Sequence, residues 1–169
     1  MSGYCSANGG GLGGIEGQYY VGNTTLYGQA GYGGQFNNGN CGTLDRYWFL
    51  RGVVRHFITR NWMVNGEVSF ADGKSQRLDP PEFGLTILTW GVGTEYRMDG
   101  SRFSVFARFY QDHLEGAQSG IPTVTQNTFL VGGKINFGAA TLFDDDRRGS
   151  TFDLPAFHRA LHWGCQAQC

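Results

Sequence analysis

One segment, Trp62-Met63-Val64-Asn65-Gly66-Glu67-Val68-Ser69-Phe70-Ala71, alternates strictly between two kinds of position. Apolar or small residues occupy every second position from Trp62 to Phe70, and the positions between them carry Asn65, Glu67 and Ser69. Successive side chains of a β-strand point to opposite faces. The period of two therefore predicts a strand whose two faces meet different environments.

Six other segments follow the same pattern: 15–21, 26–32, 48–58, 88–97, 103–112 and 128–137. A few residues break it. The large apolar residues on the otherwise polar face are Phe49, Val53, Phe57, Ile87, Phe106 and Leu130, and His56 lies on the apolar face. Large interior side chains are expected in a narrow β-barrel, whose interior must be filled. The sequence predicts an all-β, antiparallel up-and-down transmembrane barrel, with about seven strands visible.

The charges of these strands share one face. They are Arg51, Arg55, Glu67, Glu95, Arg97, Arg108, Asp112 and Lys134. A Lys or Arg facing lipid at mid-bilayer costs roughly 2–4 kcal/mol, so we expect these side chains to face the lumen. They then either line a water-filled pore or form a salt-bridged plug. An eight-stranded interior is just filled by side chains, which favours the plug.

The connections alternate in length. Tight turns are expected near 22–24, 59–61 and 99–101, and long polar loops at 33–43, 71–82 and 113–123. Outer-membrane barrels have short periplasmic turns and longer extracellular loops. The segments 15–21 and 128–137 then both run toward the periplasm. Because bacterial barrels have an even number of strands, we expect at least one upstream strand and a signal peptide that are not visible here.

This topology divides the chain into a Gly-rich N-terminal loop (1–14), transmembrane strands (15–138) and a periplasmic C-terminal tail (139–169), in which 155–163 is a candidate short helix. The composition fits this division. The 169 residues include 28 Gly, with 15% aromatic and only 16% charged residues, against about 25% charged in soluble domains. The net charge of −1 offers no basic face for a nucleic acid.

Residues with catalytic or ligating chemistry are few. No Gly-x-Ser-x-Gly, Walker or Cys–His–Asn constellation occurs, so the sequence predicts no enzyme and no cofactor. Ser69 and Ser104 share the polar face, whereas His56 lies on the other face. The four cysteines, Cys5, Cys41, Cys165 and Cys169, either form the candidate disulfides 5–41 and 165–169 or stay unpaired.

Two further clusters give weak metal signals. His158 and His162 lie four apart, without the other elements of a zinc motif. The run from Asp144 to Arg148 lacks the Gly and Glu that a calcium loop requires. We therefore predict a solvated turn there and no metal site.

Several segments also resemble a known family. They are Thr25–Tyr32 (TLYGQAGY), Trp48–Arg55 (WFLRGVVR), Glu95–Arg97, Gly100–Ser104, Val131–Gly138 and Asp146–Asp153. From about Gly14 to Leu154 the chain resembles uncharacterised porin-like outer-membrane β-barrel proteins of alphaproteobacteria. The resemblance implies a bacterial outer-membrane location, with lipid and the outer-membrane assembly machinery as partners. It brings no substrate and no catalytic residue.

Two functions follow as hypotheses. The first is a porin-like or structural outer-membrane barrel, with passive passage of small solutes as one form of it; a homo-oligomer is not indicated. The alternative is a soluble lipocalin-like up-and-down barrel that binds a small apolar ligand and exposes its charges to water. The segregated loops favour the membrane, as do the aromatic residues near strand ends: Trp48, Trp62, Tyr96, Phe103 and Phe137.

Overall fold

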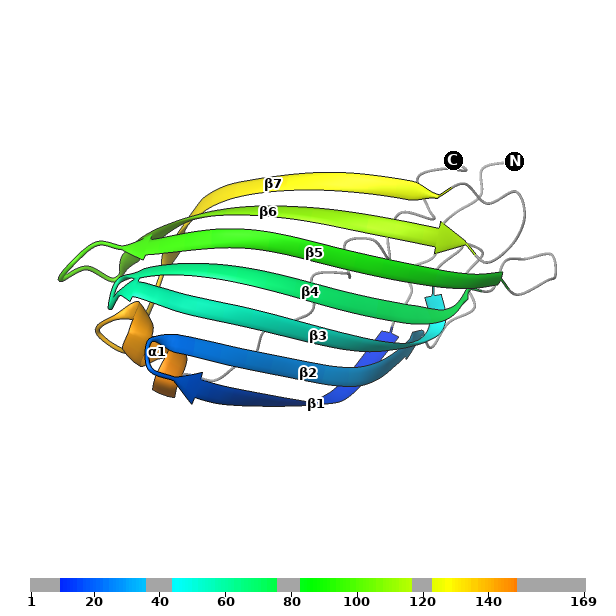
Figure 1. Ribbon diagram of the computed structural model, residues 1–169, viewed down its shortest axis with the longest axis horizontal. Helices are drawn as coiled ribbons and strands as arrows, with labels where there is room; N and C mark the ends of the chain where they lie inside the picture. The colour runs from blue at the N-terminus through cyan, green and yellow to red at the C-terminus, as the bar shows by residue number, and fades with distance from the viewer. Residues whose placement is uncertain (1–9, 36–43, 76–82, 117–122, 149–169) are drawn as a thin grey trace.

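The described chain is one antiparallel sheet followed by a short helix (Figure 1). The computed structural model describes residues 10–35, 44–75, 83–116 and 123–148. The elements are β1 (Gly10–Val21), β2 (Thr24–Gln35), β3 (Leu44–Thr59), β4 (Trp62–Ser75), β5 (Phe83–Arg97), β6 (Phe103–Gly116), β7 (Val124–Ile135) and α1 (Leu142–Arg148). Each strand pairs with its neighbour in sequence. The predicted all-β, up-and-down arrangement of seven strands is confirmed.

The sheet is not closed. Within the described residues the strand order is β1-β2-β3-β4-β5-β6-β7, without a pairing between β1 and β7. Because consecutive strands are antiparallel, β1 and β7 run in the same direction. Among the described residues, each of them therefore has one edge without a neighbouring strand, which we call its free edge.

Tight connections mark one end of the sheet, which we call the turn end. Two-residue turns join β1 to β2 at Gly22-Asn23 and β3 to β4 at Arg60-Asn61, and residues 98–102 join β5 to β6. Gly22 and Gly100 have φ angles of 54° and 69°, a region that glycine enters without steric cost. The other end, which we call the loop end, carries the connections that begin after β2, β4 and β6.

The first strand begins earlier than the sequence predicted, at Gly10 instead of Ile15. Gly10 pairs with Gln35, and Gly14 pairs with Gly31. The ladder between strands uses backbone N–H and C=O groups, so a glycine run extends a hairpin although it carries no polarity pattern. Residues 10–14 thus belong to the sheet and not to an N-terminal loop.

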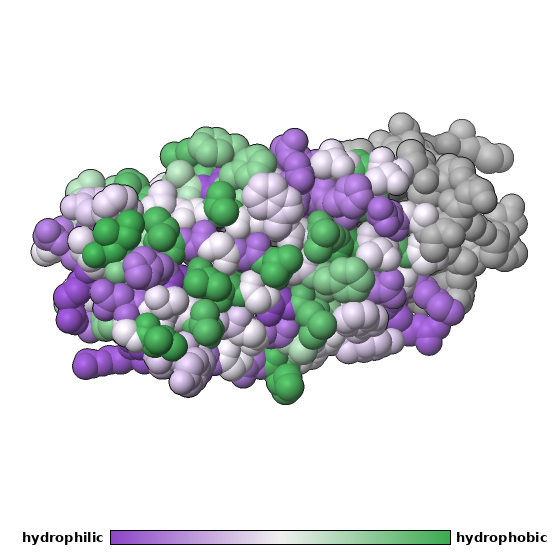
Figure 2. Space-filling view, in the orientation of Figure 1, coloured by the Kyte–Doolittle hydropathy of each residue, from purple (hydrophilic) through white to green (hydrophobic). Residues whose placement is uncertain are grey.

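The two faces of the sheet differ in burial. On one face, which we call the inner face, alternate residues such as Phe49, Arg51, Val53 and Phe57 are buried. The opposite or outer face exposes 48% of Val54 and large parts of many other apolar side chains. Apolar side chains lie across the middle of the face seen in Figure 2, and many of the most hydrophilic ones lie toward its ends.

Glycines on the inner face make room for large rings. In the register, Tyr47 lies opposite Gly33, and Phe106 lies opposite Gly132. A Cβ added at Gly33 would lie 2.5 Å from the Tyr47 ring, and one at Gly132 would lie 2.7 Å from the Phe106 ring. The inner face therefore packs an aromatic ring over a bare backbone, and the high glycine content is partly a packing requirement.

Candidate functional site

A row of polar side chains crosses the inner face, with one residue from every strand. The register joins, from β1 to β7, Glu16, Gln29, Arg51, Ser69, Thr89, Asp112 and Gln126. Arg51, Ser69, Thr89 and Asp112 are buried. The Thr89 hydroxyl donates a hydrogen bond to Asp112 Oδ1 at 2.6 Å. A polar band thus runs through the interior of the molecule, where a soluble sheet normally has its apolar core.

An ion pair and an aromatic ring lie beside this row in β2, β3 and β4. Arg51 Nη2 donates to Glu67 Oε2 at 2.9 Å, and both side chains are buried. Two guanidinium groups lie near the Tyr27 ring: the Arg51 Cζ is 5.5 Å from the ring centroid, and the Arg55 Cζ is 5.3 Å from it. The Tyr27 hydroxyl donates to Glu16 Oε2 at 2.7 Å. Buried charges are costly unless they are paired and hydrogen-bonded. The ion pair offsets part of this cost, although Glu67 Oε1 accepts no hydrogen bond from the described residues.

A second polar cluster lies nearer the turn end. Ser104 Oγ donates to Glu95 Oε1 at 2.7 Å, and Lys134 Nζ lies 3.6 Å from the same oxygen. Asn136 Nδ2 donates to Ser104 Oγ at 3.1 Å. Glu95 and Ser104 are buried. The serine hydroxyl is thus engaged on both sides by protein groups and is not presented to solvent as a nucleophile.

A cluster of buried apolar side chains lies on the loop-end side of the polar row. Its buried members are Tyr47, Phe49, Ala71, Ile87 and Leu114, with Leu85 and Val124 packed against them. These residues include two of the apolar exceptions to the polarity pattern, Phe49 and Ile87. They are the side chains that fill the interior at this level.

Helix α1 covers the inner face at the turn end. Thr141 caps the helix: its hydroxyl accepts from Asp144 N at 3.1 Å and donates to Asp144 Oδ2 at 2.6 Å. The first bond is the N-cap half of a capping box, whereas the second joins the two side chains and does not return to the N-cap backbone N–H. The hydrogen bond from Thr141, followed by that from Arg60, holds the pKa of Asp144 below its ordinary value.

Each aspartate of α1 pairs with an arginine of a different part of the sheet. Asp144 lies 2.6 Å from Arg60 of the β3–β4 turn, and Asp145 lies 3.5 Å from Arg97 at the end of β5. Asp146 lies 2.9 Å from Arg55 of β3. The predicted solvated turn at 144–148 is therefore wrong. The reason is tertiary, because three arginines that are distant in sequence from the helix meet its aspartates at this end of the sheet.

All eight charged residues that the sequence singled out for the lumen lie in strands, at inner-face positions. Arg51, Glu67, Glu95, Arg97 and Asp112 are buried. Arg55 and Arg108 are half-buried, and Lys134 is exposed near the free edge of β7. The Arg108 guanidinium lies 5.3 Å from the centroid of the Phe106 ring. Sequence reasoning missed the α1 carboxylates that pair with Arg55 and Arg97, although Thr141-x-x-Asp144 is a helix-start signal.

Other predicted residues lie outside the described part of the chain. They are Cys5, Cys41, Cys165, Cys169, His158, His162 and the segment 155–163. Among the residues that are described, no group of three or more His, Cys, Asp or Glu side chains is arranged to hold a metal ion. Within the same residues, no helix has the length and apolar character needed to cross a membrane.

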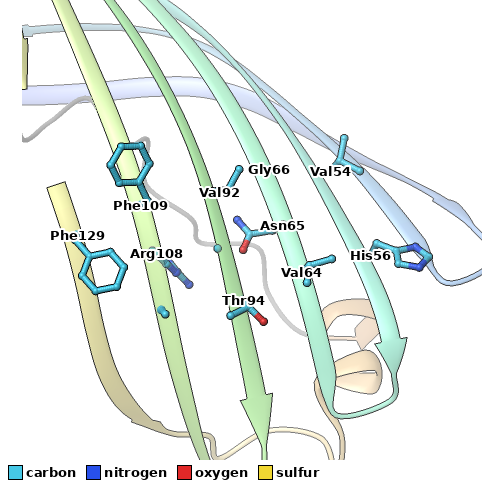
Figure 3. A pocket seen from close by; sticks show the side chains of 12 residues that line it. Val54, His56, Val64, Asn65, Gly66, Val92, Thr94, Arg108, Phe109 and Phe129 are labelled. Carbon is cyan, nitrogen blue, oxygen red and sulfur yellow. The ribbon is translucent and has the colours of Figure 1, made fainter. Parts of the chain in front are cut away.

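Two shallow depressions open on the outer face. The first, of ≈ 560 Å³, extends over β3 to β7 (Figure 3). Its apolar lining includes Val54, Val64, Val92, Phe109 and Phe129, around the small residues Gly66 and Ala107. The second, of ≈ 660 Å³, lies over Gly17, Gly28 and Gly52. Both are open hollows over small side chains, unlike the enclosed clefts with convergent polar groups that bind small molecules.

The chain matches no protein-family model, no curated protein and no solved structure.

Proposed function

We propose that this sheet is the membrane-embedded part of a bacterial outer-membrane β-barrel with a filled interior and a structural role. The supporting observation is that charged residues are buried and apolar residues are exposed, the reverse of the arrangement in a soluble protein. Arg51 and Glu67 are buried on the inner face, whereas Val54 and Trp90 are exposed on the outer face. Lipid-facing apolar residues alternate with interior polar residues in transmembrane barrels.

The height of the apolar outer surface agrees with a bilayer. On β3 the outer positions from Trp48 to Ile58 are Trp48, Leu50, Gly52, Val54, His56 and Ile58. Ten residue steps at about 3.3 Å each span ~33 Å along the strand. A strand tilted by about 40° then covers ~25 Å along the membrane normal, which is the height of the apolar band of outer-membrane barrels.

Aromatic residues border this band at both ends. Tyr32 and Trp48 are neighbours near the loop end, and Trp62 and Tyr96 are neighbours near the turn end. All four are exposed. Aromatic girdles at the two interfaces are typical of transmembrane barrels.

The polar row counts against the alternative of a soluble lipocalin-like barrel. Such a protein holds an apolar ligand in its interior. Here the inner face carries Arg51, Ser69 and Asp112 at mid-height. An apolar ligand at this level would meet charged and polar groups in place of an apolar lining.

The filled inner face also favours a structural role over passive solute passage. An apolar cluster fills the loop-end side, an ion pair and hydrogen-bonded polar groups fill the middle, and further apolar side chains such as Phe57 lie under α1 at the turn end. An open pore needs a continuous aqueous path instead. Lipid is the proposed main partner, and the outer-membrane assembly machinery is the expected route of insertion.

The free edges set a condition on this proposal. Ile15 of β1 and Val131 of β7 are 78% and 71% exposed, against 48% and 52% for Val54 and Val92 in the middle of the sheet. Unpaired backbone groups cost several kcal/mol each in lipid. Because β1 and β7 run in the same direction, antiparallel closure needs an odd number of further strands between them.

Depth-dependent quenching of tryptophan fluorescence tests the proposal. One variant keeps Trp90, at mid-height on β5, and the other keeps Trp62, next to the β3–β4 turn; all other tryptophans become Phe. In bicelles, phospholipid brominated deep in its acyl chains should quench Trp90 more than Trp62. Bromine placed near the headgroup should reverse the order. Absence of quenching at both positions in the folded protein would contradict membrane insertion.

A further inference from the structure

The residues after β7 form a strap across the turn end of the sheet. Residues 136–148, which include α1 and which we call the strap, leave β7 and pass along the inner face toward β1 (Figure 1). The strap contacts the sheet at successive places, in the reverse of the strand order. Its first contact is a hydrogen bond from Asn136 N to Arg102 O, at 2.8 Å, next to β6.

The strap next contacts the end of β5. Arg97 Nη1 donates to Ala139 O at 2.8 Å, and Arg97 Nη2 lies 3.5 Å from Asp145 Oδ2. The Arg97 side chain is almost completely buried. One arginine thus holds both the extended part of the strap and its helix.

The β3–β4 turn supplies the central contacts. Phe143 N donates to Arg60 O at 3.0 Å, and Leu142 N donates to Asn61 Oδ1 at 3.3 Å. The Phe143 ring packs edge-on against Phe57, with centroids 5.2 Å apart. Leu142 is buried. These contacts anchor the start of α1 by both backbone and side-chain groups.

The end of α1 contacts β1 and β2. Arg147 Nη2 donates to Gly22 O at 2.8 Å, and its guanidinium carbon lies 4.1 Å from the centroid of the Tyr20 ring. Asp146 accepts hydrogen bonds from Thr25 at 2.5 Å and from Arg55 at 2.9 Å. The strap therefore extends from one edge strand of the sheet to the other.

We infer that the strap is a brace that sets the curvature of the sheet at the turn end and holds its two free edges at a fixed separation. Hydrogen bonds between neighbouring strands fix the register of each pair, but the described edges of β1 and β7 share no such bonds. The strap links the two edges through contacts with the strands and turns between them. Its aspartates and arginines make these contacts specific, because each carboxylate has its own guanidinium partner.

Distance measurements between spin labels test the inference and do not require a membrane. The natural cysteines become Ser, and labels are placed at two exposed outer positions, Val21 on β1 and Ile135 on β7. The reference pair joins Val21 to Ile58 on β3, which is connected to β1 through β2. The measurement is made on the full chain in detergent or in buffer, so a failure of the membrane proposal does not affect it.

The perturbation is Asp146→Arg, which places a cation against Arg55. The pair 21–135 should lose its narrow distance distribution, while the pair 21–58 keeps its own. The double reversal of Arg55→Asp with Asp146→Arg should restore the first pair. If Asp146→Arg also broadens the 21–58 distance distribution, the milder Asp146→Asn is used instead. It should again broaden only the 21–135 distribution. An unchanged 21–135 distribution in the folded variants, or equal broadening of both pairs by Asp146→Asn, would overturn the inference.

Discussion

Two arginine substitutions on one strand distinguish a lipid-facing sheet from a water-facing one. Val54 and Ile58 both lie on the outer face of β3, and they are 48% and 46% exposed. Both are β-branched and apolar, so Val54→Arg and Ile58→Arg are closely matched. In water, each surface substitution should change the free energy of unfolding by less than about 0.5 kcal/mol.

In a bilayer the two positions differ in depth. Ile58 lies next to the β3–β4 turn, whereas Val54 lies four residues farther from it. Four steps of about 3.3 Å at a tilt of roughly 40° place position 54 ~10 Å deeper. An arginine at position 58 can extend its guanidinium to the membrane–water interface, as long cationic side chains do. We expect a cost of roughly 2–4 kcal/mol for Val54→Arg and of about 0–1 kcal/mol for Ile58→Arg.

Urea titration of the protein in phospholipid vesicles measures these costs. Tryptophan fluorescence and gel mobility before and after heating both report the folded fraction. A difference of about 2.8 kcal/mol between the variants corresponds to ~100-fold in the ratio of folded to unfolded protein. Equal, small effects at both positions would refute a lipid-facing outer surface. Equal, large effects would instead indicate a protein partner covering the whole of β3.

Three further predictions concern the inner face and α1. Arg51→Met should lower the free energy of unfolding by about 3–5 kcal/mol because it leaves Glu67 buried without its partner, whereas the double variant with Glu67→Met should recover most of the loss in urea titrations. Gly91→Ala should lower the free energy of unfolding by about 1–3 kcal/mol in the same assay, because its Cβ would overlap the opposing tyrosine ring. A Cβ at Gly28 meets nothing within 4 Å, so Gly28→Ala should change this free energy by less than about 0.5 kcal/mol. Equal effects of the two substitutions would contradict the packing argument. The folded pKa of Asp144 lies below its ordinary value of 3.8. Its stabilising contribution is therefore present at neutral pH and is lost as the pH falls below 3.8 and through the folded value. In an acid titration followed by circular dichroism, Asp144→Asn should lack this pH-dependent loss of stability, and an acid transition identical to that of the unchanged protein would count against the pairing.

On the inner face of the sheet, the local sequence pattern predicts which face each charged residue occupies, whereas tertiary packing decides which partner it meets. Alternation alone predicted that Arg51, Glu67 and Asp112 share one face, because the side-chain period of a strand is fixed by its backbone geometry. The partner of each charge did not follow from this. Arg51 meets Glu67 because the β3–β4 register places them diagonally across adjacent strands.

The sequence by itself determined the number of strands, their order and the two ends of the sheet, since these depend on local periodicity and on turn residues such as Gly22 and Gly100. The early start of β1 at Gly10 was decided by pairing with β2, because glycines carry no polarity signal. The position of α1 was likewise decided by tertiary structure. Its local signal was present at Thr141, but its aspartates find partners only where three arginines far from the helix in sequence meet them. Contacts of this kind depend on how all seven described strands come together, which no single segment encodes.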